Sequence, residues 1–577
     1  MEQAKRTGYP SVDRPWLKYY SEEAKHAKQP EGTVYDYLYD SNRAHLDEVA
    51  LEYFGRKTTY GQMFARIEAA AKAFWQCGVR SGDVVAFCTV TTPETVYAFY
   101  GLNRLGAVAN MIDPRTNADR IRQYLQESKA RVIVVIDAAY PKIAKLIGSA
   151  CVEAVIVVSA ANAAPFAMRI GYRLTQGKPR MPLGGRCVPW NAFVAAGRSA
   201  RAAYAAYRPN TPAAILHTGG TTGTPKGVVL SNDNFNTMVV FQKYARTRMQ
   251  RGNSFLGIMP PFIAYGLVCG INNPLCLGLR IILIPKFDPQ QFAALVVKHK
   301  PNHALGVPSY WESLAKSEGI GDLSFLENAI TGGDGITPSA EEAVNTFFKA
   351  HGCRHKLSKG YGMTELSSTA TYSVCDACNP PESVGIPLFW NNVKIVEPGT
   401  QKELPYRQQG EICLTSPTMM LGYYRNEEET RRTLLTHDDG VTWIHSGDIG
   451  YMDEDGVLFL VGRSKRVIPR PDGHKVWPSQ IESVLSEHPA VAACAVVGLH
   501  NPDGENGRIP TAFVVLKDGM AGSSALIDEL DRMSKARLPE RDVALAYHFI
   551  DALPLTPIGK VDYRALERMG AEDAAAR

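Results

Sequence analysis

The chain has 577 residues, of which 45% are hydrophobic and 21% are charged. This balance is typical of a soluble protein, and the length suggests roughly two to four domains. The 63 Lys and Arg residues nearly balance the 58 Asp and Glu residues, so the net charge is only +5. A charge this small is not the signature of a nucleic-acid-binding protein, and we predict no nucleic-acid partner.

The N-terminal thirty residues are polar and aromatic, and they lack the apolar segment of a signal peptide. The best candidate for a membrane-spanning segment, residues 275–284, is short and contains Arg280. We therefore expect a cytoplasmic protein with no membrane-spanning helix.

The 11 cysteines are odd in number and scattered along the chain, which favours free thiols over a disulfide framework. Cys375 and Cys378 form the one close pair. Neither a second pair nor a histidine cluster accompanies them at zinc spacing, so we predict a solvated loop and no structural metal.

Short β-branched runs alternate with amphipathic stretches along most of the chain, which predicts an α/β fold. The runs that fit buried strands are at residues 84–87, 132–136, 155–158 and 281–284. A polar segment at residues 462–466 separates two extended pieces and predicts a domain boundary. We expect residues 1–462 to form a large body of several subdomains with layered sheets and helices, and residues 463–577 to form a small, mobile α+β domain.

Residues 165–186 look inserted between two strands, and they combine an amphipathic pattern with cations that have few acidic neighbours. The cations of interest are Arg169, Arg173, Lys178 and Arg180. A basic amphipathic segment can rest weakly on anionic lipid, which would place the protein at the inner membrane surface. A solvated surface excursion is the alternative.

The strongest motif occupies residues 214–230, where an apolar strand enters a loop rich in Gly, Thr and Lys and a second apolar strand follows. Glycines let backbone N–H groups converge, threonines offer hydroxyls, and a lysine supplies charge for phosphate oxygens. These residues are Thr218, Gly219, Gly220, Thr221, Thr222, Gly223 and Lys226. The order matches neither the Walker loop nor a dinucleotide-binding loop. A Gly/Thr hairpin without a ligand would look similar in isolation.

Further motifs follow this loop: Tyr-Gly-Met-Thr-Glu at 361–365, Ser-Gly-Asp at 446–448, Gly-Arg at 462–463, and Pro-Ile-Gly-Lys at 557–560. Together they make nearly the whole chain resemble the adenylate-forming superfamily of acyl-CoA synthetases, luciferases and peptide-synthetase adenylation domains. The double-glycine form of the loop and the opening at residues 13–20 look most like fatty-acyl-CoA ligases.

The resemblance implies an enzyme that uses ATP to convert a carboxylic acid into an acyl-AMP and then transfers the acyl group to coenzyme A. The first step builds negative charge on phosphoryl oxygens, which cations and Mg²⁺ must stabilise. A medium- or long-chain fatty acid is the favoured substrate. The alternatives are a ligase that loads a separate carrier protein, and a catalytically weak nucleotide- or acyl-binding protein.

The resemblance also implies roles for individual residues. Glu365 is expected to bind Mg²⁺ with help from Thr221, Tyr361 to stack on adenine, and Thr364 to lie near the α-phosphate. The backbone at Gly333 and Asp334 would pass beside the adenine and acyl groups. Remaining nucleotide contacts fall to Gly362, Asp448 and Arg463, with Asp448 on the ribose hydroxyls. Local capping, packing or surface charge would explain each residue without a ligand.

Lys560 is the expected catalytic residue, which would bridge the carboxylate and the α-phosphate during adenylation. Lys465 matches the hinge about which the small domain rotates, and Gly473 would lie near the channel for coenzyme A. This segment departs from the family pattern at Arg466, Pro469, Pro471 and Gln480.

Phe262, Ile263 and Tyr265 are expected to line the acyl pocket. Relatives that activate amino acids carry an Asp in this stretch, and the corresponding residue here is Ile263. An apolar residue there argues against an α-amino acid, because the substrate ammonium would be buried without a partner.

Overall fold

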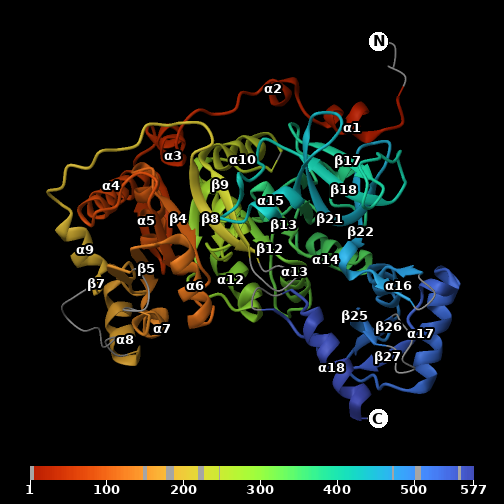
Figure 1. Ribbon diagram of the computed structural model, residues 1–577. Coiled ribbons are helices and arrows are strands. Elements are labelled where there is room, and N and C mark those ends of the chain that lie inside the picture. The colour runs from red at the N-terminus through yellow and green to blue at the C-terminus, as the bar shows by residue number, and fades with distance from the viewer. Residues whose placement is uncertain are drawn as a thin grey trace.

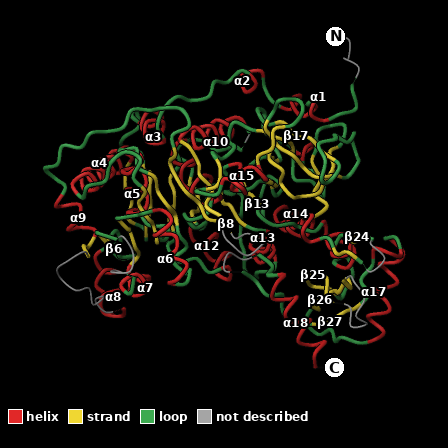
Figure 2. Tube along the Cα trace, in the orientation of Figure 1, coloured by secondary structure: helices red, strands yellow, loops and turns green. Residues whose placement is uncertain are grey.

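The structure is a computed structural model, and it describes residues 6–146, 152–176, 187–218, 226–245, 247–470, 474–500, 508–556 and 560–576. A large N-terminal body is followed by a small C-terminal domain, which lies at one end of the molecule (Figure 1). Helices and strands alternate through both parts (Figure 2). The predicted α/β fold is confirmed.

The first layer is an eight-stranded sheet. Its strand order is β19 (Gly422–Tyr423), β9 (Lys226–Ser231), β8 (Pro212–Thr218), β4 (Val108–Met111), β3 (Val84–Cys88), β5 (Val132–Ile136), β6 (Ala154–Val158) and β7 (Cys187–Pro189). Strands β3 to β8 pair in parallel, whereas β8, β9 and β19 pair antiparallel. The neighbouring helices are α4 (Tyr60–Gln76), α5 (Pro93–Arg104), α6 (Ala118–Ser128), α7 (Tyr140–Ala144), α8 (Phe166–Gln176) and α9 (Trp190–Ala196).

The second layer is a nine-stranded sheet. Its order is β16 (Ile386–Pro387), β15 (Thr371–Tyr372), β14 (Ser358–Tyr361), β13 (Asn328–Gly332), β12 (His303–Gly306), β10 (Ser254–Gly257), β11 (Arg280–Leu283), β1 (Val49–Tyr53) and β2 (Arg56–Thr59). The associated helices are α3 (Val34–Asn42), α10 (Asn232–Tyr244), α11 (Asn273–Cys276), α12 (Phe292–His299), α13 (Pro308–Ala315) and α14 (Pro338–Ala350). The four runs predicted as strands are found in β3, β5, β6 and β11.

A third, five-stranded antiparallel sheet completes the large body. It contains β17 (Asn392–Val396), β18 (Gly410–Thr415), β21 (Thr442–Met452) and β20 (Leu434–Thr436), with β22 (Leu458–Arg463) on the free side of β21. Helix α15 (Glu427–Thr433) precedes β20, and the N-terminal helices α1 (Pro10–Asp13) and α2 (Glu22–Lys25) run along this end of the molecule. Trp16 is fully buried and its backbone lies against Gly456, where a φ of +87° and the lack of a Cβ permit the close approach.

The C-terminal domain has a hydrophobic core separate from that of the large body. Its elements are β23 (Ile468–Pro469), β24 (Lys475–Val476), α16 (Pro478–Leu485), β25 (Val491–His500), β26 (Arg508–Leu516), α17 (Ser524–Arg537), β27 (Ala546–Phe549) and α18 (Tyr563–Ala576). The predicted boundary after residue 462 falls within β22 and stays a prediction. Among the described helices, none is long and apolar enough to cross a membrane.

Candidate active site

A cavity of about 3670 Å³ lies between the large body and the C-terminal domain. It is lined by every predicted site residue whose side chain the structure describes. These are Thr218, Lys226, Phe262, Ile263, Tyr265, Gly333, Asp334, Tyr361, Gly362, Thr364, Glu365, Asp448, Arg463 and Lys560. Residues far apart in the sequence therefore meet in one place.

The β8–β9 hairpin carries the ends of the predicted phosphate loop. Thr218 pairs with Lys226 in the antiparallel register, and the Thr218 hydroxyl donates to the Lys226 carbonyl at 3.4 Å. The loop between them, with Gly219, Gly220, Thr221, Thr222 and Gly223, lies outside the described residues. The hairpin register nevertheless places both ends of the loop at the cavity wall.

Two residues that we did not predict from sequence connect the lysine to the expected magnesium ligand. The Lys226 ammonium forms an ion pair with Glu429 of α15 and lies 4.8 Å from the centre of the Tyr423 ring. The Tyr423 hydroxyl in turn donates to Oε1 of Glu365 at 2.7 Å. In the sequence, Glu429 belongs to an acidic run that is typical of a solvated helix start. The pairing of β19 with β9 brings this helix next to Lys226, and the sequence alone does not indicate that contact.

Glu365 lies on the short 3₁₀ turn Thr364–Leu366, shortly after β14 ends. The residue is only 8% exposed, yet it lines the cavity. A carboxylate in this position needs partners because an unpaired buried charge is costly, and Tyr423 supplies one. Oxygen donors of this kind are also those that Mg²⁺ prefers.

The second group consists of Tyr361, Asp448 and Arg463. The Tyr361 hydroxyl donates to Oδ2 of Asp448 at 2.7 Å, and Nε of Arg463 lies 3.0 Å from Oδ1. Asp448 and Arg463 face each other in the β21–β22 register. Burial raises the pKa of Asp448, and the Arg463 guanidinium and the Tyr361 hydroxyl oppose that rise. Burial also raises the pKa of Tyr361 well above the ordinary tyrosine value, with Asp448 adding to the rise.

Lys560 reaches this group from the C-terminal domain. A Cβ built at Gly333 would lie 3.7 Å from both Cε and Nζ of Lys560, and Gly333 has a φ of +84°. Burial lowers the pKa of Lys560, the carboxylates of Asp334 and Asp448 raise it, and Arg463 lowers it further. The ammonium is thus within electrostatic range of charged groups of the large body.

Part of the cavity lining is apolar or aromatic, with Arg115 over the Phe262 ring. Phe262 is 7% exposed, Ile263 follows it, and Tyr265 begins a π-helix that extends over Tyr265–Asn272. The Tyr265 hydroxyl donates to the Gly306 carbonyl at 3.4 Å, so its polar atom has a partner. This part of the lining continues with Leu305, Val307, Tyr310 and Ile330.

The segment that departs from the family pattern is also partly described. Arg466 lies 2.6 Å from a carboxylate oxygen of Glu482 and 3.6 Å from the centre of the Tyr563 ring. The arginine therefore has both a charge partner and an aromatic partner within the C-terminal domain. The Lys465 side chain, Pro471 and Gly473 lie outside the described residues.

Comparison with known proteins identifies the family. Residues 38–424 match the family model described as AMP-binding enzyme, and residues 480–560 match that of the AMP-binding enzyme C-terminal domain. The chain belongs to the AMP-binding enzyme family. The predicted membership of the adenylate-forming superfamily is thereby confirmed.

Two relatives and one solved structure resemble this AMP-binding enzyme over almost its full length. The long-chain-fatty-acid–CoA ligase of Bacillus subtilis (strain 168) is 31% identical over 563 residues, which are 96% of this chain and 97% of the relative. The 4-coumarate–CoA ligase-like 9 of Oryza sativa subsp. japonica is 30% identical over 558 residues, 93% of each chain. The crystal structure of the ATP-bound RpMatB-BxBclM chimera B1 has a TM-score of 0.80 at 26% identity and covers 94% of this chain and 99% of its own.

Replacing Tyr361 by Phe tests whether the contact with Asp448 belongs to the nucleotide site of this AMP-binding enzyme. We expect AMP to bind roughly tenfold more weakly, because a hydrogen bond to a charged group contributes about 1.5–3 kcal/mol. Titration calorimetry with AMP measures the change. Tyr100→Phe is the matched control, since it removes a buried hydroxyl that donates to Asn272 away from the described cavity wall. Equal affinities for the two variants would contradict the assignment.

Proposed function

We propose that this AMP-binding enzyme activates a medium- or long-chain fatty acid as its acyl-AMP and transfers the acyl group to coenzyme A. The observation that carries the proposal is one cavity lined by two kinds of residue. Its lining includes the charged residues Lys226, Glu365, Asp448, Arg463 and Lys560, and it also includes the apolar or aromatic residues Phe262, Ile263 and Tyr265. The full-length similarity to a long-chain-fatty-acid–CoA ligase supports the same substrate class.

The charged part of the lining suits a nucleotide. Asp448 can accept hydrogen bonds from ribose hydroxyls, Arg463 lies beside it, and Tyr361 offers a flat face for adenine. Lys226 would contact the phosphates beside the loop that contains Thr221. Glu365 would hold Mg²⁺, an ion that supplies charge neutralisation for the ATP phosphates when it is bound.

Lys560 is the group best placed to act on the reacting atoms. An ammonium between the substrate carboxylate and the α-phosphate attracts both, and it stabilises the charge that develops when the carboxylate attacks phosphorus. The lysine must stay protonated for this role. Its pKa is lowered by burial, so adenylation should be lost as the pH rises through a value below the ordinary lysine pKa.

Replacing Lys560 by Ala should slow formation of acyl-AMP by about two to three orders of magnitude, on the scale of losing one preorganised charge contact. The conversion of supplied acyl-AMP to acyl-CoA should be spared, because that half-reaction does not need the lysine beside the phosphate. The two half-reactions are measured separately, by pyrophosphate release and by thioester formation. Lys535→Ala, an exposed lysine on α17, is the control. Equal losses in both half-reactions would contradict separate roles.

The thiol acceptor is coenzyme A in this proposal, and a carrier protein is the second candidate. Both acceptors share the first half-reaction. In either case we propose that the C-terminal domain moves, so that Lys560 no longer fills space that the thiol needs beside the acyl carbonyl. Lys465 is the proposed hinge, and Gly473 is proposed to border the thiol channel.

The substrate class follows from the apolar wall around Ile263. An alkyl chain gains roughly 0.8 kcal/mol for each buried methylene, whereas an ammonium buried there would have no partner. A flat aryl acid would also fit an apolar wall, and the 4-coumarate–CoA ligase-like relative makes aryl acids the alternative substrate class.

Catalytic efficiency should rise along a series of straight-chain acids until the pocket is filled, and then fall. Pyrophosphate release with saturated acids of increasing length, beside 4-coumarate, leucine and phenylalanine, measures the series. Ile263→Asp should depress fatty-acid activity more than the matched, uncharged Ile263→Asn, because it buries an unpaired carboxylate. Faster turnover of an amino acid or of 4-coumarate than of every fatty acid would refute the proposed substrate class.

We also propose a cytoplasmic location with weak contact at the inner membrane surface. Helix α8 exposes three apolar side chains, with Phe166 74%, Met168 45% and Ile170 44% accessible, and Arg169 lies among them. Of the other cations, the Arg173 side chain, Lys178 and Arg180 lie outside the described residues. Exposed apolar side chains beside cations favour adsorption to anionic lipid, where a fatty acid is dissolved.

Changing Arg169, Arg173, Lys178 and Arg180 together to Gln should weaken sedimentation with anionic vesicles at low salt. Each cation is expected to contribute about 1 kcal/mol near the charged surface. A control with the same charge change replaces four exposed cations elsewhere, namely Lys298, Lys300, Arg354 and Lys402. If the two variants sediment alike, the membrane proposal fails.

A further inference from the structure

A cluster of two histidines and a cysteine lies in the five-stranded sheet. Cys413 is on β18, His445 is on β21, and His437 follows β20. The register pairs Lys394 of β17 with Cys413 of β18, and Cys413 with His445 of β21, so these side chains share one face of the sheet. His437 lies in the turn that follows β20. The backbone N–H of His437 donates to the Val441 carbonyl and closes this turn. The ligand atoms of Cys413, His437 and His445 all lie within 4.8 Å of one another.

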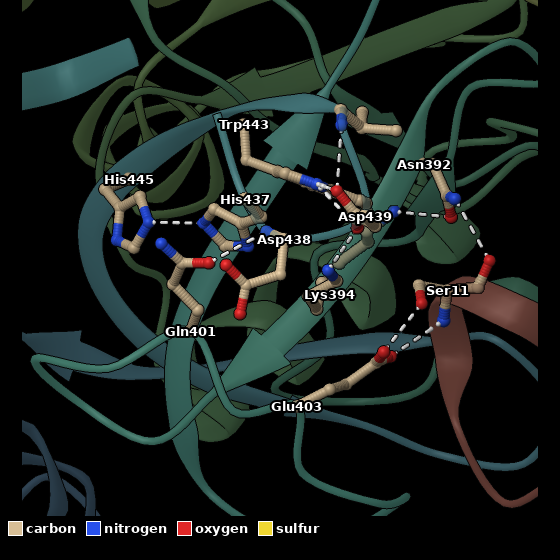
Figure 3. A network of polar contacts seen from close by, with 12 residues as sticks. Ser11, Asn392, Lys394, Gln401, Glu403, His437, Asp438, Asp439, Trp443 and His445 are labelled. Carbon is tan, nitrogen blue, oxygen red and sulfur yellow. Dashed lines mark hydrogen bonds and ion pairs between the residues drawn. The ribbon is translucent and has the colours of Figure 1, made fainter. Parts of the chain in front are cut away.

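The hydrogen bonds around the two rings leave one nitrogen without a partner. Nδ1 of His445 lies 3.0 Å from Oε2 of Glu411. Nε2 of His445 lies 2.8 Å from Nε2 of His437 (Figure 3). The two Nε2 atoms must share a single proton, because one ring has to donate to the other. Whichever ring carries that proton, the buried Nδ1 of His437 has no hydrogen-bond partner.

Among the described charges near the cluster, Lys394 has a carboxylate partner, whereas Glu411 and the exposed Asp438 act on the two histidines. Lys394 lies 2.6 Å from Asp439 and 4.5 Å from the centre of the Trp443 ring, so its ammonium is neutralised by a carboxylate. Cys413 is fully buried beside Val396 and Trp443. A divalent cation bound by the Cys413 thiolate next to the Glu411 carboxylate would make an electrically neutral group, which is the arrangement that a buried site requires.

We propose that Cys413, His437 and His445 bind a divalent metal ion of the zinc type, with Glu411 as the residue that orients His445. One thiolate and two imidazoles form a ligand set for borderline-soft ions, and a carboxylate on the far nitrogen of a ligating histidine is a common support. The two Nε2 atoms need to move from 2.8 Å to about 3.3 Å apart, the spacing of two nitrogens in tetrahedral zinc coordination. On binding, the thiol proton is released to solvent, and the proton between the two Nε2 atoms moves to Nδ1 of the ring that carried it.

A surface hollow of about 360 Å³ gives the ion a path to the cluster. It is lined by Lys394, Thr400, Gln401, Lys402, His437, Asp438 and Asp439. Because His437 borders this hollow, water can complete the coordination as the fourth ligand. His445 and Glu411 line the large substrate cavity, whereas Cys413 and His437 are not among its described lining residues, so the site lies between that cavity and the small hollow.

The cluster is nevertheless connected to the nucleotide group. Glu411 uses Oε2 for His445 and accepts the backbone N–H of Gly447 on Oε1 at 3.1 Å. Gly447 directly precedes Asp448, and the Ser446 hydroxyl donates to the Ile412 carbonyl at 2.6 Å. A metal ion at the cluster would therefore stabilise the strand segment from which Asp448 projects.

The experiment uses the full chain, freed of metal with a chelator and titrated with Co²⁺, which reports thiolate ligation by a charge-transfer band in the near ultraviolet. We expect one equivalent of Co²⁺ per chain to produce the band and Zn²⁺ to displace it. Cys413→Ser should abolish the band. Cys88→Ser, which changes another fully buried strand cysteine, should retain it.

His437→Gln provides a second variant in case Cys413→Ser does not fold, and it should weaken Co²⁺ binding at least tenfold while the far-ultraviolet circular dichroism stays that of the wild type. A wild-type titration without the band would overturn the proposal. A band that persists in folded Cys413→Ser would also overturn it. So would a His437→Gln variant that binds Co²⁺ as tightly as the wild type.

Discussion

Several charged side chains of this protein lie at the wall of one large cavity, where they are held by partners. Lys226 is paired with Glu429, which is distant in the sequence, whereas Asp448 with Arg463 and Arg466 with Glu482 are paired between elements that are close in the sequence. The pairing is a physical requirement, since the cost of removing an ion from water exceeds what packing alone can offset. The third sheet supplies Asp448 and Arg463, and α15 supplies Glu429.

The same requirement explains how an apolar interior and a site for a highly charged substrate can share one cavity. The paired charges keep their orientation before a nucleotide arrives, so the reorganisation that binding demands is small. Tyr423 illustrates the principle, because it packs beneath the Lys226 ammonium with its ring and holds Glu365 with its hydroxyl. Tyr423 thus contacts both Lys226, the expected phosphate-binding residue, and Glu365, the expected magnesium ligand.

Lys560 differs from the other cations because it comes from the C-terminal domain and its neighbours come from the large body. Its lowered pKa records a balance in which burial outweighs the attraction of Asp334 and Asp448. A lysine held in this way can leave the cavity more readily than one locked in a close ion pair. The histidine–cysteine cluster lies on the large-body side of this arrangement, where Glu411 joins it to the segment before Asp448.

The sequence by itself determined the α/β class, the buried strands within β3, β5, β6 and β11, and the candidate residues of the nucleotide site. These follow from local patterns: β-branched runs form strands, and Gly, Thr and Lys together in a loop favour phosphate. Only the tertiary structure decided which charges are paired and how strands far apart in the chain are registered. Tyr423, Glu429 and the cluster of Cys413, His437 and His445 have no recognisable spacing, because their proximity is created by antiparallel pairing between strands whose separation along the chain is arbitrary.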